Sequence, residues 1–118
     1  MYTRHMDCVF CAIASGEAPA KKEYEDDEIL AFWDLHPKAP IHLLIIPKVH
    51  IENLGLMKEE DSRILGRLQW VARSLAEKMK IDDAFRLSTN SGSGAGQVIM
   101  HLHYHLTGGW KEGENINI

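Results

Sequence analysis

The chain has 118 residues, of which 45% are hydrophobic and 25% charged, a composition typical of one globular domain with a modest core. The formal net charge of −4 and the lack of a lysine or arginine block argue against nucleic-acid binding as the main task. No apolar run approaches the ~20 residues of a membrane span, so we expect a single domain over residues 1–118, in the cytoplasm and without a membrane partner.

The first half of the chain predicts one helical turn followed by strands. We expect the turn over residues 8–14 and strands over residues 22–25, 29–34 and 41–47. The first two strands are joined by an acidic turn, and the third is strongly apolar and ends at a proline. This half therefore contributes strands and little helix.

The second half predicts one long helix and two further strands. The helix begins at Asp61 or Ser62 and continues to about Lys80, because apolar residues recur there at the spacing of one helix face. These residues are Ile64, Leu65, Leu68, Val71, Ala72, Leu75 and Met79. Strands are expected over 84–89 and 99–107. Most connections are too short for parallel crossovers, so we predict an α+β fold, an antiparallel sheet of about five strands with one long helix packed on it.

Trp70 interrupts the pattern of the helix. At 100° per residue it falls opposite the apolar stripe, among polar residues such as Arg67 and Ser74. A large aromatic side chain on a polar face indicates a contact surface. The alternative is that the N- or C-terminal segment of the same chain covers it.

Three histidines alternate with apolar residues near the C-terminus. His101, His103 and His105 recur with the period of two of a β-strand, which places them in a row with a spacing of roughly 6–7 Å. Imidazoles change protonation near neutral pH, so such a row offers nucleophiles, proton donors or metal ligands. The other histidines, His5, His36 and His42, are interpreted as surface or core residues.

A loop rich in glycine and serine precedes the row. Residues 90–97 read Asn-Ser-Gly-Ser-Gly-Ala-Gly-Gln, which excludes the interior of a helix or strand. Glycines let backbone amides approach a ligand closely and form concave anion sites. The loop is either a phosphate cradle beside the histidines or a flexible connection.

Together these motifs resemble the histidine triad (HIT) superfamily of nucleotide hydrolases and transferases. The resemblance covers the chain from about residue 8 to residue 110, and the closest branch is that of the small purine nucleoside phosphoramidases. The motifs that carry it are 101–106, with Thr107 in the last apolar place of the family pattern, 90–97, 46–50, 31–34, and 8–11 with Ile13 and Pro19. The resemblance implies a HIT-like fold and a homodimer formed through the long helix and the adjoining strand.

The resemblance also assigns roles to residues. His103 would attack phosphorus and carry the nucleotidyl group as a covalent phosphoramidate, while His105 would contact the phosphoryl oxygens or the leaving group. The substrate-binding set would be Trp33, Asp34, Leu35, Asn90, Ser93, Gly94, Gly96, Gln97, Val98 and His105. Asp34 suits two ribose hydroxyls because a carboxylate accepts from both. Many members of the branch carry a serine in place of Val98, so the preference for a leaving group is open.

Four residues also predict a metal site. Cys8 and Cys11 have the spacing of a metal hook, and His50 and His101 would complete a structural zinc site like that of some HIT branches. The alternatives are that both cysteines are unligated, or that His101 and His103 join a third histidine in a zinc metallohydrolase.

The function predicted is therefore cleavage of nucleoside phosphoramidates or related purine nucleotide conjugates, with no organic cofactor. The alternative is a nucleotide-binding or partner-binding module whose turnover is incidental. The intact triad of His101, His103 and His105 favours the enzyme, because binding alone has no need of a nucleophilic imidazole.

Overall fold

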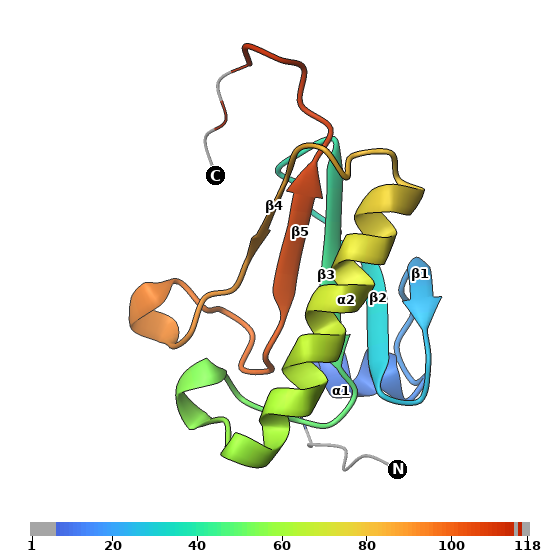
Figure 1. The fold of residues 1–118 in the computed structure, drawn as a ribbon. Coiled ribbons are helices and arrows are strands. Elements are labelled where there is room, and N and C mark those ends of the chain that lie inside the picture. The colour runs from blue at the N-terminus through green and yellow to red at the C-terminus, as the bar shows by residue number, and fades with distance from the viewer. Residues whose placement is uncertain (1–6, 115, 117–118) are drawn as a thin grey trace.

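The computed structural model describes residues 7–114 and 116, and its centre is a five-stranded antiparallel sheet (Figure 1). The strand order is β1-β2-β3-β5-β4, and every neighbouring pair is antiparallel. The strands are β1 (Lys22–Glu25), β2 (Ile29–Trp33), β3 (Ile41–Pro47), β4 (Phe85–Ser88) and β5 (Tyr104–Gly108). The predicted α+β fold, with one long helix on an antiparallel sheet, is confirmed.

Helix α2 (Ser62–Lys78) lies along one face of the sheet and buries the predicted apolar stripe, except that Met79 follows the helix as its C-cap and is only partly buried. It ends two residues before the prediction because Lys80 adopts a left-handed conformation, with φ of 62°. The amide of Lys80 donates to the carbonyl of Glu77, and that of Ile81 to Ala76, the hydrogen bonds of a Schellman motif. No helix in the described part of the chain is long and apolar enough to cross a bilayer.

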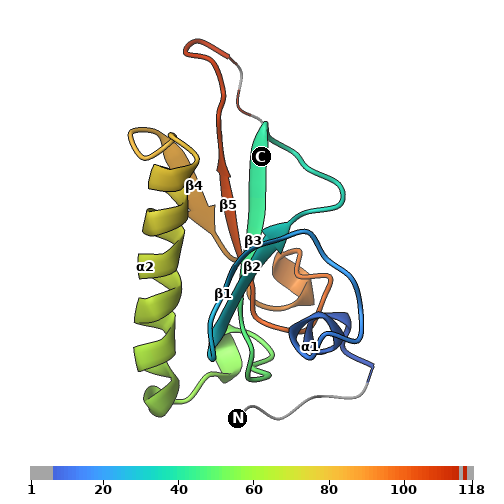
Figure 2. The same cartoon turned by 90° about the vertical axis from the view of Figure 1, so that its right-hand side faces the viewer.

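The opposite face of the sheet is covered in part by the short helix α1 (Val9–Ala14), as Figure 2 shows. Phe10, Ile13 and Ala14 of α1 pack on side chains of β2 and β3. Those partners are Leu30, Phe32, Leu44 and Ile46. The sheet therefore carries two separate apolar layers, one under each helix.

The last strand differs from its predicted range of 99–107, because β5 begins only at Tyr104. The amide of His101 donates to the carbonyl of Ile99 at 2.9 Å, which makes a tight bend, and the amide of Leu102 donates to Ile51 at 2.6 Å. The backbone hydrogen bonds described for residues 99–103 are therefore not part of the sheet. Short 3-10 turns at Leu54–Leu56, Glu59–Asp61 and Ser93–Ala95 were not predicted either.

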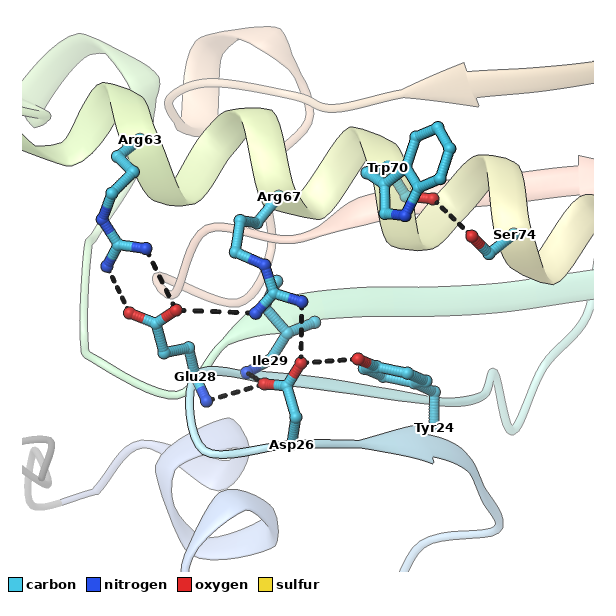
Figure 3. Close-up of polar contacts among 8 residues, drawn as sticks. All are labelled: Tyr24, Asp26, Glu28, Ile29, Arg63, Arg67, Trp70 and Ser74. Atoms are coloured by element: carbon cyan, nitrogen blue, oxygen red, sulfur yellow. Dashed lines mark hydrogen bonds and ion pairs between the residues drawn. The ribbon is translucent and has the colours of Figure 1, made fainter.

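A carboxylate fastens the β1–β2 turn to α2 (Figure 3). Asp26 accepts hydrogen bonds from the Tyr24 hydroxyl at 2.6 Å, from the amides of Glu28 and Ile29, and from Arg67 of α2 at 3.0 Å. Partial burial alone would raise the pKa of Asp26, but these four donors outweigh it and lower the pKa to about 2. The acidic turn expected from the sequence is therefore a clamp between the two layers.

This clamp predicts that Asp26→Asn lowers the free energy of unfolding by about 2 kcal/mol at pH 7, as the depressed pKa implies. Because the folded pKa is depressed, the contribution is present above the unfolded pKa of about 4 and is lost as the pH falls toward 2. Urea unfolding of both proteins would measure this. The exposed neighbour offers a control, Asp27→Asn, which should change stability by under ~0.5 kcal/mol; equal losses in the two variants would contradict the clamp.

Candidate functional site

The three histidines of the predicted row lie on the α1 side of the sheet, although only His105 belongs to β5. The ring of Phe10 contacts His101 at a centroid distance of 5.9 Å and His103 at 5.1 Å. His103 and His105 are ring neighbours at 5.0 Å. Leu102 and Leu106, which alternate with them, pack in the layer under α2. The alternation seen in the sequence therefore does separate the two sides of the segment.

One backbone hydrogen bond fixes which nitrogen of His103 carries its proton. Nδ1 lies 2.7 Å from the carbonyl oxygen of His101, and a carbonyl can only accept. Nδ1 therefore holds the proton, and Nε2 presents its lone pair. His103 as a residue is 9% exposed and is therefore largely desolvated.

His42 joins the row as a fourth imidazole, against the expectation of a mere surface or core residue. It is 3% exposed, and its Nε2 lies 3.0 Å from Nδ1 of His105 and 3.5 Å from an Asp34 oxygen. The amide of Lys38 donates to Nδ1 of His42 at 3.0 Å, so the proton of a neutral His42 sits on Nε2. His36 stays exposed as expected, and His5 lies outside the described residues.

The tautomer of His42 sets that of His105. Since Nε2–H of His42 faces Nδ1 of His105, that nitrogen accepts, and the proton of a neutral His105 is on its Nε2. His103 and His105 are thus neighbours with opposite tautomers. The first offers a lone pair at Nε2 and the second an N–H.

Burial keeps these rings neutral near pH 7. It lowers the pKa of His103, against the opposing effects of the His101 carbonyl and Asp34. Burial, and then the neighbouring His103 and His42, lower the pKa of His105 to about 4. Burial also lowers the pKa of His42. A neutral imidazole is the form that can act as a nucleophile.

A cavity of about 720 Å³ lies beside His105. Of the residues predicted to bind substrate, Asp34, Asn90 and His105 line it together. His42 and Thr107 also line it, and the sequence did not single these two out. The structure thus brings the predicted ribose and phosphate ligands to one place.

Other predicted substrate residues do not line this cavity. Trp33 packs against the layer under α2, on the far side of the sheet from the histidines, and its indole donates to Glu23 at 2.9 Å. Leu35 is 88% exposed after the end of β2. Val98 is 87% exposed and lines a smaller cleft of about 390 Å³ that also borders Cys8 and His50. Phe32 of β2, rather than Trp33, faces α1.

The Gly/Ser loop holds itself in shape through Gln97. The Gln97 side chain accepts from the amide of Gly92 at 2.8 Å and donates to the carbonyls of Glu52 and Ile99. The backbone amides of Gly96 and Gln97 donate within the loop, to Ser93 and Gly92. Both Gly92 and Gly96 have positive φ, near 92° and 95°, where a side chain would be strained. The loop residues Ser93, Gly94, Gly96 and Gln97 were all predicted to bind substrate. Of these four, Ser93 and Gly94 have backbone amides that no described hydrogen bond uses, so these amides could donate to a ligand.

The four predicted metal ligands meet at the N-terminal end of the row. Nδ1 of His101 lies 3.3 Å from Sγ of Cys8 and 3.6 Å from Sγ of Cys11, and Nδ1 of His50 lies 3.4 Å from Sγ of Cys11. All four ligand atoms lie within 4.8 Å of one another. A zinc tetrahedron has S···N edges of roughly 3.5 Å, given its bond lengths.

The protonation pattern fits a metal here and not at the other cluster of ligand-type residues, Asp34, His42 and His105. Nε2 of His101 donates to the carbonyl of Pro47 at 2.8 Å, so its Nδ1, which faces the sulfurs, carries the lone pair. In the second cluster the Lys38 amide places the proton of His42 on Nε2, the atom that a metal would need. Nδ1 of His101 faces the two sulfurs and Nε2 donates to Pro47, so neither ring nitrogen is available for a zinc ion shared with His103.

Comparisons with known proteins point to one family. The family model described as "Scavenger mRNA decapping enzyme C-term binding" matches residues 7–115. The chain is 44% identical to a HIT family hydrolase from Legionella pneumophila, whose crystal structure superposes with a TM-score of 0.87 over 89% of this chain and 95% of that one.

Two further relatives carry zinc in their names. The 14 kDa zinc-binding protein of Brassica juncea is 43% identical over 105 residues, 87% of this chain and 93% of that protein. A Zn-bound histidine triad family protein from Mycobacterium smegmatis is 34% identical, with a TM-score of 0.80 over 95% of this chain and 81% of that one. With the family model matching nearly its whole length and the histidine row in place, the chain belongs to the histidine triad (HIT) family.

Proposed function

We propose that this protein is a nucleotidyl hydrolase or transferase that cleaves nucleoside phosphoramidates, or related purine nucleotide conjugates, through a covalent intermediate on His103. The observation that carries the proposal is the pair of opposite tautomers. The His101 carbonyl leaves the lone pair of His103 on Nε2, and His42 leaves a proton on Nε2 of the adjacent His105. A nucleophile beside a hydrogen-bond donor is the arrangement that phosphoryl transfer needs.

In the first step Nε2 of His103 attacks phosphorus, and the bond from phosphorus to the leaving nitrogen breaks. The electron pair of that bond stays on the leaving nitrogen, which takes one proton. That proton comes from solvent, while the Nε2–H of the neutral His105 donates a hydrogen bond to a phosphoryl oxygen or the leaving nitrogen. In the second step water attacks phosphorus, the bond to Nε2 breaks, and one proton of the water returns to solvent.

The residues around the row would hold the nucleotide. Asp34 and Asn90 line the cavity at His105 and suit the ribose hydroxyls and the phosphate. The amides of Ser93 and Gly94 would donate to phosphoryl oxygens, while Gly96 and Gln97 would keep the loop in shape. Leu35 beside Asp34 would cover the base. Trp33 is not part of the proposed nucleotide site, because its side chain lies on the α2 side of the sheet.

The proposed intermediate predicts that His103→Ala abolishes nucleotidyl transfer to the protein. Mixing the protein with an adenosine 5′-phosphoramidate and quenching in base should give one nucleotidyl adduct per chain in the wild type and none in the variant, by intact-protein mass spectrometry. AMP binding should stay within about tenfold, because the other pocket donors remain. His36→Ala, which removes an exposed imidazole outside the row, should keep the adduct. Normal turnover in His103→Ala would sink the covalent mechanism.

We extend the proposal to a structural zinc ion held by Cys8, Cys11, His50 and His101. The ion would supply a cross-link between α1, the segment after β3 and the segment before β5. With four protein ligands it would leave no open position for substrate. Zinc binding needs both cysteines as thiolates, which fits a reducing compartment such as the cytoplasm.

The zinc site predicts about one zinc per chain in protein isolated without chelator. Cys8→Ser should lose most of this zinc and melt at a lower temperature, while a measurable fraction of activity remains. Asp34→Asn tests the other cluster and should leave the zinc content unchanged. The opposite pattern in elemental analysis, with zinc lost in Asp34→Asn and retained in Cys8→Ser, would favour a metallohydrolase.

We further propose a homodimer in which α2 forms part of the interface. Trp70 is 64% exposed on the polar face of α2, with the Arg73 guanidinium 5.9 Å from its ring, and Figure 3 shows it beside Ser74 of the next turn. The exposure excludes cover by the described part of the same chain.

Trp70→Glu should then shift the sedimentation coefficient toward that of a monomer, because a buried, unpaired carboxylate is costly at an interface. Leu56→Glu changes another exposed apolar residue, outside α2, and should leave the coefficient unchanged. A dimer that survives Trp70→Glu would refute this interface.

A further inference from the structure

The face of the sheet that carries His105 is only partly covered. Helix α1 packs on β2 and β3, and the far ends of β4 and β5 extend beyond it (Figure 2). Strand pairing sets Arg86 of β4 opposite Thr107 of β5, and Thr107 opposite His42 of β3. Ser88 is likewise opposite His105. Directly paired residues point to the same side of a sheet, so the side chains of Arg86 and Ser88 continue the histidine face outward.

This open end is the 720 Å³ cavity, and its charge differs from that of the whole chain. Lys38 and Arg86 both line it, in a protein whose formal net charge is −4. The one carboxylate in the lining, Asp34, already accepts from the amide of His36 at 2.7 Å and lies 3.5 Å from Nε2 of His42. Two cations that line one cavity attract an anion locally, even where the global field repels it.

The cavity is wide enough for two parts of a substrate. Asp34 follows β2 at one side, and Arg86 and Ser88 belong to β4, three strand spacings away in the order β2-β3-β5-β4. At about 4.8 Å per strand this is roughly 14 Å. A ribose at Asp34 therefore leaves the β4 side to whatever is attached to the other side of phosphorus. His105 lies between them, next to His103.

From these positions we infer that the β4 side of the cavity is the leaving-group subsite and that it selects leaving groups that carry their own negative charge, a carboxylate or a phosphate. Arg86 contacts that charge and Lys38 adds to the positive field of the cavity, while the hydroxyl of Ser88 and the amide of Asn90 supply further hydrogen bonds. The inference rests on the proposed function and names the substrate class of the same site. An arginine fork suits either anion, since both present two coplanar oxygens.

The test uses three adenosine 5′-phosphoramidates that differ only in the amine. One is linked to β-alanine, with a free carboxylate; one to β-alaninamide, its neutral isostere; and one to phosphoethanolamine through nitrogen. We expect kcat/KM for the two anionic conjugates to exceed that of the neutral one by about tenfold, with the ratio falling as salt is added. A preference for one anion over the other identifies which class the subsite takes.

Variants then distinguish an effect of the cations in the cavity from an effect of the overall charge of the protein. Arg86→Gln and Lys38→Gln should each lower the ratio of anionic to neutral kcat/KM several-fold, and Arg86→Glu should bring it below one. Arg73→Gln removes a cation from the α2 side and should leave the ratio unchanged. Equal kcat/KM for acid and amide in the wild type, or a ratio that Arg86→Gln and Lys38→Gln leave intact, overturns the inference while the proposed function stands. Failure to cleave any of the three conjugates, with no adduct on His103, overturns both.

Discussion

The segment before β5 lies outside the sheet for five residues, and this departure orients the histidine row. In a regular strand the carbonyl of His101 would bond to a neighbouring strand. Here it instead accepts from the ring of His103 at 2.7 Å. The nucleophile proposed for this protein is thus oriented by the backbone two residues before it, and the strand that follows provides a rigid support for His105.

The same peptide connects the row to the cysteines. The carbonyl of His101 holds His103, while the ring of His101 turns to the thiols of Cys8 and Cys11. Phe10, between the two cysteines in sequence, packs edge-on against the rings of both histidines. A displacement of α1 would therefore reach His103 through two routes, one through packing and one through the backbone. The N-terminal helix is short, but the geometry of the row depends on it.

Sequence reasoning located the strands and the row well and failed where both faces of the sheet are buried. β2 and β3 are covered by α1 on one side and α2 on the other, so their residues are apolar at nearly every position and show no alternation. Without alternation, nothing indicated that Trp33 faces α2 while Phe32 faces α1. The predicted strand over 99–107 was too long for another reason. An alternation with a period of two shows to which side the side chains point, but it does not show whether the backbone pairs with a neighbouring strand. The isolated polar residue in an apolar strand was the available signal for His42.

Two clusters of ligand-type residues lie in this small protein, and backbone groups decide what each can do. At His101, Nε2–H donates a hydrogen bond to the carbonyl of Pro47, so the lone pair of Nδ1 faces sulfur. At His42, Nδ1 accepts a hydrogen bond from the amide of Lys38, so Nε2–H faces His105. The first pattern suits a cation and the second suits a hydrogen-bond chain that ends at the substrate. Since a neutral imidazole carries one proton, one backbone contact per ring is enough to separate metal binding from hydrogen bonding to the substrate in a continuous group of histidines.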